Sequence, residues 1–457
     1  MHKNDSKSGV NGARTGQSGS ALQFHQTQLA NGLTMVGETN PAARSLALGF
    51  FVRTGSRDET PDVSGVSHFL EHMVFKGTPR RTALDVNRDF DAIGANYNAY
   101  TSEENTVFHA AVLPEYLPQA VDILADILRP SLRVEDFDME KNVIIEEIGM
   151  YDDQPMWSAY DAAKQAFFVP HPLGNSVLGS KRSIAALQRD QMFQYWKRRY
   201  IAPNITVVAA GNFDWAHLVR LIEERCGGWE QGDAPRERPQ VAGSGAFRLV
   251  PKEKVLQEHL FLLGGGPPAS SPLRYSAELL ATALGDDTAS RLYWALVDPG
   301  LADSADVSFH EYDGAGVFYT YLSGEPGRAH SNLDIAVEVF RQVQHDGLTK
   351  QELNQAKSKL GSRIVRGSER PMGRMQALGF YWTYLKEYHS VDDDLRAIDS
   401  VSLKTIRQVL DEYPLDRLTI VALGPLDAVA WNAPVSTAKP GVKHHPRKKK
   451  AAPRRRK

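Results

Sequence analysis

The sequence predicts an α+β protein of two homologous domains that arose by internal duplication, each a mostly antiparallel sheet with helices packed on it. Two repeated segments carry this prediction. The apolar, β-branched segment 204–214 recurs as 417–427, an offset of 213 residues. Segment 132–137 resembles 348–353 at an offset of 216 residues, and each opens a long helix. Two matches at nearly one offset indicate a duplicated unit of roughly 210 residues.

The elements of the first half follow from local patterns. Asn31-Gly32 stands between two extended segments, which is typical of a type I′ hairpin over 24–38. An apolar run predicts a strand over 45–52, and Gly65 and Ser67 offer the N-terminal boundary of the next helix. The remaining predictions are helices over 83–93, 115–128, 134–151 and 183–200 and strands over 96–103 and 205–210.

Length and composition indicate how the chain is divided into domains. With 457 residues, of which 42% are hydrophobic and 24% charged, it has room for two or more domains with substantial cores. Segment 231–245 is rich in proline, glycine and charged residues and predicts a linker. We therefore expect a disordered N-terminus over 1–22, a first domain over 23–230, a homologous second domain over 246–432, and a basic disordered tail over 433–457.

Several features bear on the compartment. No apolar run approaches the length of a transmembrane helix, and the polar N-terminus lacks the apolar segment of a secretion signal. The single Cys226 rules out an internal disulfide and a cysteine-based metal site, and it reads as a buried thiol. A cytoplasmic location fits best. Lys3, Lys7 and Arg14 leave a transit peptide, and so the mitochondrial matrix, open.

The C-terminal tail balances the charge of the chain. Residues 439–457 hold ten Lys or Arg and no acid, while the whole chain has a net charge of −2. Such a tail is a charge-balancing extension, or it adheres to an anionic partner such as nucleic acid, lipid or an acidic protein. No aromatic residues are interleaved with the basic ones, which weakens a specific nucleic-acid role.

The segment His68-Phe69-Leu70-Glu71-His72 is the most informative motif of the chain. On a helix, His68 and His72 lie on adjacent turns of one face, with Glu71 beside them. This H-x-x-E-H pattern suits a divalent metal held by two imidazoles, with a carboxylate that takes a proton from a metal-bound water. A pentapeptide of this kind also arises by chance in a few chains per hundred, so the context decides.

A catalytic zinc requires a third protein ligand and one open position. The predicted helix 134–151 offers Glu140, Glu146 and Glu147. Glu140 and Glu147 are seven residues apart and share a face, while Glu146 points about 100° away. Spacing alone favours the simpler interpretation, in which they are charged residues on the surface of a helix.

Three segments together resemble the pitrilysin/insulinase family of zinc peptidases, in the branch of the mitochondrial processing peptidase β subunit and its short bacterial relatives. They are Ser67 to Thr78, Asn98-Ala99-Tyr100-Thr101 and Glu140 to Glu147. The resemblance covers about 24–430 and is densest over 45–155. It implies one Zn²⁺ held by His68, His72 and Glu147 in the first domain and none in the second. An N₂O donor set of this kind also accepts Mn²⁺ or Co²⁺.

The resemblance also implies roles for the neighbouring residues. Glu71 would act as general base on a zinc-activated water and later protonate the leaving amine, and Glu140 would be the outer neighbour of a ligand. An extended peptide substrate would lie along Asn98, Ala99, Tyr100 and Thr101 by addition to a sheet edge. An ordinary edge strand explains this segment as well.

One part of the family pattern is missing. Active members place an arginine and a tyrosine from the second half near the substrate carbonyl, but this chain reads Pro299-Gly300-Leu301-Ala302-Asp303-Ser304 there. A homologous companion subunit would supply the pair, most simply in a heterodimer although a homodimer is open, or the chain has only weak activity. Arg291, Tyr381 and Tyr384 could substitute, yet no spacing selects them. The chief alternative is a non-catalytic scaffold of the same family within a larger complex. A nucleic-acid-binding protein that uses the tail is a weaker one.

Overall fold

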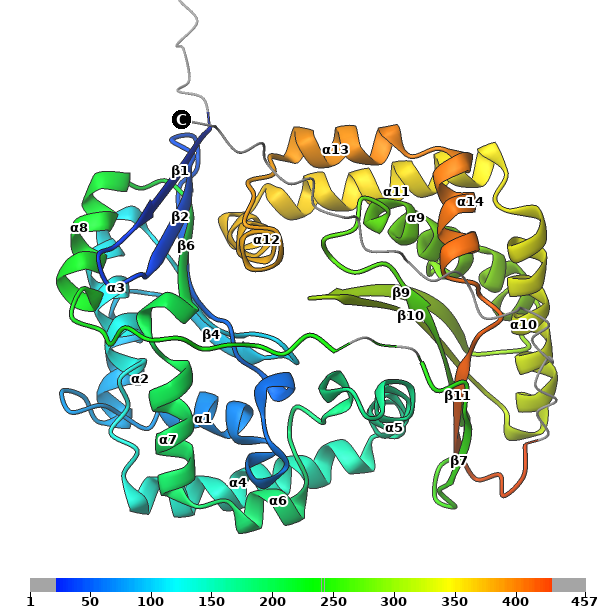
Figure 1. Ribbon diagram of the computed structural model, residues 1–457, viewed down its shortest axis with the longest axis horizontal. Coiled ribbons are helices and arrows are strands. Elements are labelled where there is room, and N and C mark those ends of the chain that lie inside the picture. The colour runs from blue at the N-terminus through cyan, green and yellow to red at the C-terminus, as the bar shows by residue number, and fades with distance from the viewer. Residues whose placement is uncertain (1–21, 240, 242, 430–457) are drawn as a thin grey trace, which may run out of the picture.

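The computed structural model describes residues 22–239, 241 and 243–429. These residues form two halves, each a sheet with helices on it, which face one another across the centre of the molecule (Figure 1). The predicted disorder of 1–21 and the basic tail lie outside the described residues. In the part of the chain that the structure describes, no helix combines the length and apolar character needed to span a bilayer.

The first sheet has six strands in the order β1-β2-β6-β3-β5-β4. Only β2 and β6 run parallel, and the other neighbours are antiparallel. The predicted hairpin is present as β1 and β2. In sheet order the strands are β1 (Gln23–Gln28), β2 (Thr34–Thr39), β6 (Ile205–Gly211), β3 (Leu46–Val52), β5 (Thr106–Val112) and β4 (Asn96–Thr101).

The second sheet repeats this order without a counterpart of β1, as β7-β11-β8-β10-β9. Its single parallel pair, β7 and β11, occupies the place of β2 and β6. The strands are β7 (Phe247–Pro251), β11 (Thr419–Gly424), β8 (Glu258–Gly266), β10 (Ala315–Gly324) and β9 (Ser304–Tyr312). The predicted fold class, two duplicated α+β units with mostly antiparallel sheets, is confirmed.

Helices account for most of the remaining chain. The α-helices of the first half are α1 (Val66–Val74), α2 (Ala83–Ala92), α3 (Leu117–Ile127), α4 (Val134–Asp153), α5 (Pro155–Phe168), α6 (Lys181–Ala186), α7 (Arg189–Arg199) and α8 (Trp215–Cys226). Those of the second half are α9 (Arg274–Gly285), α10 (Ala329–Asp346), α11 (Lys350–Ser368), α12 (Pro371–Tyr384), α13 (Val391–Ser400) and α14 (Leu403–Glu412).

The prediction of one helix over 183–200 is wrong. The chain is extended at Leu187 (φ −60°, ψ 135°), where α6 ends, and at Gln188, where α7 begins. Leu187 is fully buried in the core, and the side chain of Gln191 accepts from the backbone N–H of Gln188. Burial of one side chain at the break, together with a new N-cap, therefore outweighs the continuity of the helical pattern.

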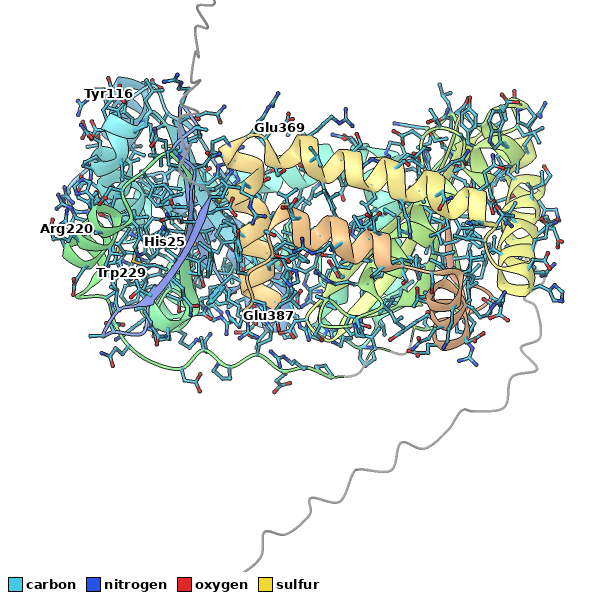
Figure 2. The ribbon with its side chains drawn as sticks, turned by 90° about the horizontal axis from the view of Figure 1, so that it is seen from above. His25, Tyr116, Arg220, Trp229, Glu369 and Glu387 are labelled. Carbon is cyan, nitrogen blue, oxygen red and sulfur yellow. The ribbon has the colours of Figure 1, made fainter. Side chains whose placement is uncertain are left out.

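The two halves exchange a helix. Helix α5 follows α4 in the first half but packs on the second sheet, with Phe167 and Phe168 buried among residues of β8, β10 and β11. In return α12 packs on the first sheet, where Gly379 lies against the ring of Phe51 so closely that a side chain at this position would overlap it. Seen from above, Glu369 marks the turn from α11 into α12 (Figure 2). Each sheet is thus covered in part by a helix from the other half.

The segment between the halves has no helix or strand in its described residues, but it is not a free tether. The Arg236 side chain is 1% exposed and contacts the Asp58 carboxylate at 2.7 Å. It also donates to the backbone oxygen of Glu104, in the turn that follows β4. The segment is therefore anchored on the first half beside the candidate substrate strand.

Candidate metal centre

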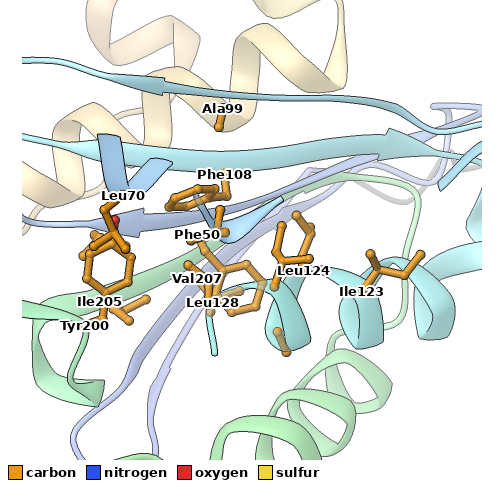
Figure 3. Close-up of a cluster of buried hydrophobic side chains, with 14 of the residues drawn as sticks. Phe50, Leu70, Ala99, Phe108, Ile123, Leu124, Leu128, Tyr200, Ile205 and Val207 are labelled. Carbon is orange, nitrogen blue, oxygen red and sulfur yellow. The ribbon is translucent and has the colours of Figure 1, made fainter. Parts of the chain in front are cut away.

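Helix α1 carries the H-x-x-E-H motif and is held at both its start and its apolar face. The carboxylate of Glu59 accepts the backbone N–H groups of Gly65 at 2.7 Å and Ser67 at 2.8 Å, which caps the helix from outside. Gly65 has φ +89°, a value that favours glycine. Leu70 packs in the core with Phe50, Phe108 and Tyr200 (Figure 3). With this face buried, the two histidines point toward α4.

The structure brings His68, His72 and Glu147 together. One Glu147 oxygen lies 3.8 Å from His68 Nε2, and the other lies 3.6 Å from His72 Nε2. One candidate donor atom from each residue lies within 4.8 Å of the others. A tetrahedral zinc with bonds of about 2.0–2.2 Å separates its ligand atoms by roughly 3.3–3.6 Å. The three side chains therefore fit a shared divalent ion, whereas Glu146 is exposed on another face of α4.

Glu140 lies behind His72. Its Oε1 is 2.9 Å from His72 Nδ1, and its Oε2 is 2.6 Å from Lys76 Nζ. Burial opposes ionisation of Glu140, but the hydrogen bonds from His72 and Lys76 outweigh it and hold its pKa below the usual value. A carboxylate on Nδ1 orients the imidazole so that Nε2 faces the metal position. Lys76 was not predicted as a site residue, although it follows His72 by only four residues, just beyond the end of α1.

The two imidazoles differ in their surroundings. Burial, with the neighbouring His72, lowers the pKa of His68 to about 3. For His72, burial acts in the same direction, but the hydrogen bond to Glu140 and the charge of Glu147 outweigh it and raise the pKa. His68 is therefore neutral at ordinary pH, and a neutral imidazole offers the lone pair that a metal binds.

Glu71 lines the same cleft as the candidate donors His68 and Glu147. Thr101 Oγ1 donates to Glu71 Oε2 at 2.6 Å. Burial raises the pKa of Glu71, while the Thr101 hydrogen bond and the His72 charge work against that rise. Thr101 was predicted as a substrate contact, and the structure places it against the carboxylate that would act as base.

A cleft of about 470 Å³ opens in front of these residues. Ala99, Tyr100 and Thr101 of β4 line it together with His68, Glu71 and Glu147, whereas Asn98 is exposed and outside the lining. Strand β4 is the edge strand of its sheet, so one row of its backbone groups has no neighbouring strand. The cleft thus joins the metal donors to a sheet edge.

The second half brings none of the expected polarising residues to this cleft. All described residues that line it fall within 68–179. Arg291 is held by Glu352 at 2.6 Å, and the Tyr384 hydroxyl accepts from Asn105 Nδ2 at 3.1 Å. Tyr381 packs against Arg274 instead. Asp303, at the place of the family tyrosine, accepts from the side chain of Gln257.

The chain is similar to known proteins over most of its length. Residues 34–181 match the family model described as insulinase (peptidase family M16), and residues 186–360 match the peptidase M16 inactive domain. A protein of Mycobacterium leprae described as an uncharacterized zinc protease is 33% identical over 426 residues, covering 92% of this chain and 96% of its own. One of Bacillus subtilis with a similar description is 30% identical over 399 residues, covering 86% and 97%.

Solved structures share the fold. The crystal structure of a protease from Helicobacter pylori superposes with a TM-score of 0.83 at 20% identity, covering 88% of this chain and all of that one. At this level of identity the likeness concerns the arrangement of the two halves. The three candidate donors, His68, His72 and Glu147, all lie within the residues that the first family model matches.

Proposed function

Since this chain belongs to the insulinase family of peptidases (peptidase family M16), we propose that it is a zinc-dependent endopeptidase of peptides or unfolded polypeptide segments. One Zn²⁺ per chain is held by His68, His72 and Glu147. The observation that carries the proposal is the convergence of these three donors from α1 and α4 beside a buried glutamate and a cleft. The catalytic unit is assigned to 23–230, and 246–432 forms a homologous domain without metal.

A zinc ion in this site lowers the pKa of a water and polarises a peptide carbonyl. Glu71 takes a proton from the attacking water and delivers it to the leaving amide nitrogen. The Thr101 hydroxyl holds one carboxylate oxygen of Glu71, so that the other oxygen is free for the proton. Glu140 holds His72 in place through Nδ1, with Lys76 as the counter-charge of Glu140.

An extended peptide is the form of substrate that this site fits. The backbone of Asn98, Ala99, Tyr100 and Thr101 offers hydrogen bonds along the free edge of β4, next to the metal donors. Sheet-edge binding selects an unfolded segment, because a folded protein cannot present an extended backbone there. Ala99→Pro should therefore raise KM much more than it lowers the zinc content.

A homologous subunit completes the site in this proposal. Within the described residues no donor from the second half lines the cleft. Loss of an oxyanion donor typically costs a factor of about 100 to 1,000 in rate. We therefore expect the purified chain alone to be slow and co-expression with a related subunit to restore the rate. Full activity of the chain by itself would contradict the companion subunit.

The replacement Glu71→Gln tests the proposal directly. It removes the base but none of the metal donors, so zinc should remain stoichiometric while peptide hydrolysis falls by about 10²- to 10⁴-fold. The matched control is Glu146→Gln, at an exposed glutamate of α4 that faces away from the site. Unchanged turnover in Glu71→Gln would remove Glu71 from the mechanism.

A second candidate is a non-catalytic scaffold of the same family within a larger assembly. The lack of second-half donors in the cleft favours it. A scaffold need not retain zinc and should cleave no peptide with any homologous subunit, so metal analysis together with a cleavage assay separates the two. Contact of the basic tail with an anionic partner is proposed as an accessory property, which deletion of 439–457 would abolish.

A further inference from the structure

Arg236 lies in the segment between α8 and β7, which runs from the first half toward the second (Figure 1). Its guanidinium makes three hydrogen bonds. Nε and Nη2 donate to the two carboxylate oxygens of Asp58 at 3.0 Å and 2.7 Å, and Nη2 also donates to the backbone oxygen of Glu104 at 2.6 Å. The side chains of Arg236 and Asp58 are only 1% and 3% exposed. A buried, two-armed pair of this kind fixes the relative position of the segments that it joins.

The Asp58 side of this contact leads to the start of helix α1. Arg199 Nη2 lies 2.7 Å from Asp58 Oδ1, and Arg199 Nε donates to Thr54 Oγ1 at 3.0 Å. The Tyr195 hydroxyl lies 2.7 Å from Thr54 Oγ1 and 2.7 Å from Ser67 Oγ. Tyr195, Thr54 and Ser67 are all buried. Since Ser67 directly precedes the first histidine of the motif, this chain of contacts supports the part of α1 that carries the candidate metal donors.

The Glu104 side of the contact leads to the end of strand β4. Glu104 belongs to the turn between β4 and β5. The backbone N–H of Arg57 donates to the backbone oxygen of Glu103 at 2.8 Å, and Arg57 Nη1 lies 2.6 Å from the Glu104 carboxylate. From the second half, the backbone N–H of Asp313 donates to the same carboxylate at 3.1 Å. The turn after β4 is therefore held by the first half, by the linker and by the second half at once.

The two elements that Arg236 supports meet again inside the cleft. There Thr101 of β4 donates to Glu71 of α1 at 2.6 Å. The Arg236 contacts therefore join α1 and β4 outside the cleft, and the Thr101 hydrogen bond joins them inside it. Arg236 itself is not among the described residues that line the cleft. A displacement of one element against the other changes the position of Glu71, and an error of about 1 Å in the position of a reacting group can cost about 100-fold in rate.

We propose that Arg236 is a positioning residue of the cleft, which holds β4 against α1 so that Thr101 stays hydrogen-bonded to Glu71. The inference rests on the proposed function, because the base and the substrate strand take their roles from it. It gives the linker a part in the reaction, beyond joining the two halves.

Hydrogen–deuterium exchange of the full chain measures this positioning without any turnover. Arg236→Met removes the guanidinium and keeps an apolar stem. The backbone amides of 65–72 and 102–105 should then exchange faster by about tenfold or more, because the lost hydrogen bonds involve a charged group. Exchange over 274–285, in α9 of the second half, should stay as in the wild type. A general loss of stability would instead raise exchange in all three segments.

Peptide hydrolysis supplies a second measurement. Arg236→Met should lower kcat by about 10- to 100-fold and leave KM and the zinc content nearly unchanged, because it removes no contact with the substrate strand's free edge or with a metal donor. Thr101→Val removes the hydrogen bond to Glu71 directly. Arg236→Met/Thr101→Val should therefore be no slower than the slower single variant, since both replacements act on one contact.

Two further variants complete the experiment. Arg238→Met is the matched control, because Arg238 lies two residues later in the same segment, is 60% exposed and contacts only the Asp313 carboxylate at 3.0 Å among the described residues. It should behave as the wild type in both measurements. Arg236→Lys can keep one charged contact but cannot span Asp58 and Glu104 together. It should show smaller changes in the same two segments, and it carries the test should Arg236→Met fail to fold.

Three results would overturn the inference. The first is unchanged exchange over 65–72 and 102–105 in a folded Arg236 variant. The second is an equal rise over 274–285, which would reduce Arg236 to a contributor to general stability. The third is a loss of zinc in step with the loss of rate, which would place the effect at the metal donors. Absence of hydrolysis in the wild type would contradict the proposed function, and exchange would still decide whether Arg236 holds α1 and β4 together.

Discussion

The helix pair α1 and α4 in the first half and the pair α9 and α11 in the second half show how one architecture supports different chemistry. Glu147 stands thirteen residues after the first residue of α4, and Arg363 stands thirteen residues after the first residue of α11. In the first half the carboxylate meets two imidazoles. In the second half the guanidinium, together with Lys359, binds Asp286 at the end of α9.

The paired helices have the same arrangement in both halves, and their side chains determine which charges occupy the space between them. In the second half the charges of the protein neutralise one another, because Asp286 has two cationic partners, Lys359 and Arg363. In the first half the donors His68, His72 and Glu147 surround a position that suits a cation from outside.

Replacement of Glu147 by Arg gives the first half the side chain of the second. Glu147→Arg should abolish zinc binding and hydrolysis together, because it removes one ligand and places a positive charge beside the other two. Metal analysis after dialysis measures the effect. Glu146→Arg makes the same change one residue earlier on the exposed face of α4 and should retain zinc. Retained zinc in Glu147→Arg would show that Glu147 is not a ligand of the metal.

Lys76 contacts Glu140, which in turn contacts the candidate ligand His72. The second half has no equivalent of Glu140, because Ala356 occupies the corresponding position of α11. Lys76→Met should weaken zinc binding by about 10- to 100-fold, because Glu140 loses the cation that accompanies its contact with His72. Lys76→Arg keeps the charge and should largely restore affinity. Competition with a chelator provides the measurement. Equal affinity in all three proteins would show that Lys76 does not act through Glu140.

Replacement of Asp286 tests whether its ion pairs with Lys359 and Arg363 stabilise the second half. Asp286→Asn should lower the free energy of unfolding by about 1–2 kcal/mol, a modest loss because Lys359 and Arg363 are partly exposed and can be rehydrated. The zinc content should not change. Urea unfolding with metal analysis checks both points. A loss of zinc would mean that the two helix pairs are coupled rather than independent.

The buried carboxylates of the second half predict a pH effect. The folded-state pKa of Glu278 and Glu311 is raised by burial to about 7, above the usual value of 4.5. Their contribution to stability is therefore greatest at low pH and is lost as the pH rises through about 7. Relative to Glu278→Gln/Glu311→Gln, the wild-type melting temperature should fall by about 2–4 °C between about pH 5 and about pH 8. Parallel pH profiles for the two proteins would contradict these pKa values.

Local patterns in the sequence were sufficient for much of the fold and for placing the two histidines of the candidate metal site on one helix. The hairpin at Asn31-Gly32 and the helices around His68 and Glu140 depend on neighbours in the chain. The repeat of 204–214 at 417–427 is visible when the sequence is compared with itself. The choice of Glu147 over Glu146 needed the family resemblance, because spacing left both readings open. Once the helix is built, its seven-residue separation from Glu140 places it on the site's face.

What the sequence could not predict depends on contacts between distant segments. The cap that Glu59 provides for α1 and the hydrogen bond from Thr101 to Glu71 join residues that no helical or strand period relates. The exchange of α5 and α12 is of the same kind, since each helix buries its apolar face on the sheet of the other half. The break between α6 and α7 shows tertiary burial of Leu187 prevailing over a local pattern.

Zinc K-edge X-ray absorption of the purified, zinc-loaded full chain identifies the atoms that bind the metal. We expect one zinc per chain with nitrogen and oxygen neighbours only, two of them imidazoles, and the loss of this spectrum in Glu147→Arg but not in Glu146→Arg. A sulfur neighbour at about 2.3 Å, which only Cys226 or a methionine could supply, would contradict it. So would an unchanged spectrum in Glu147→Arg.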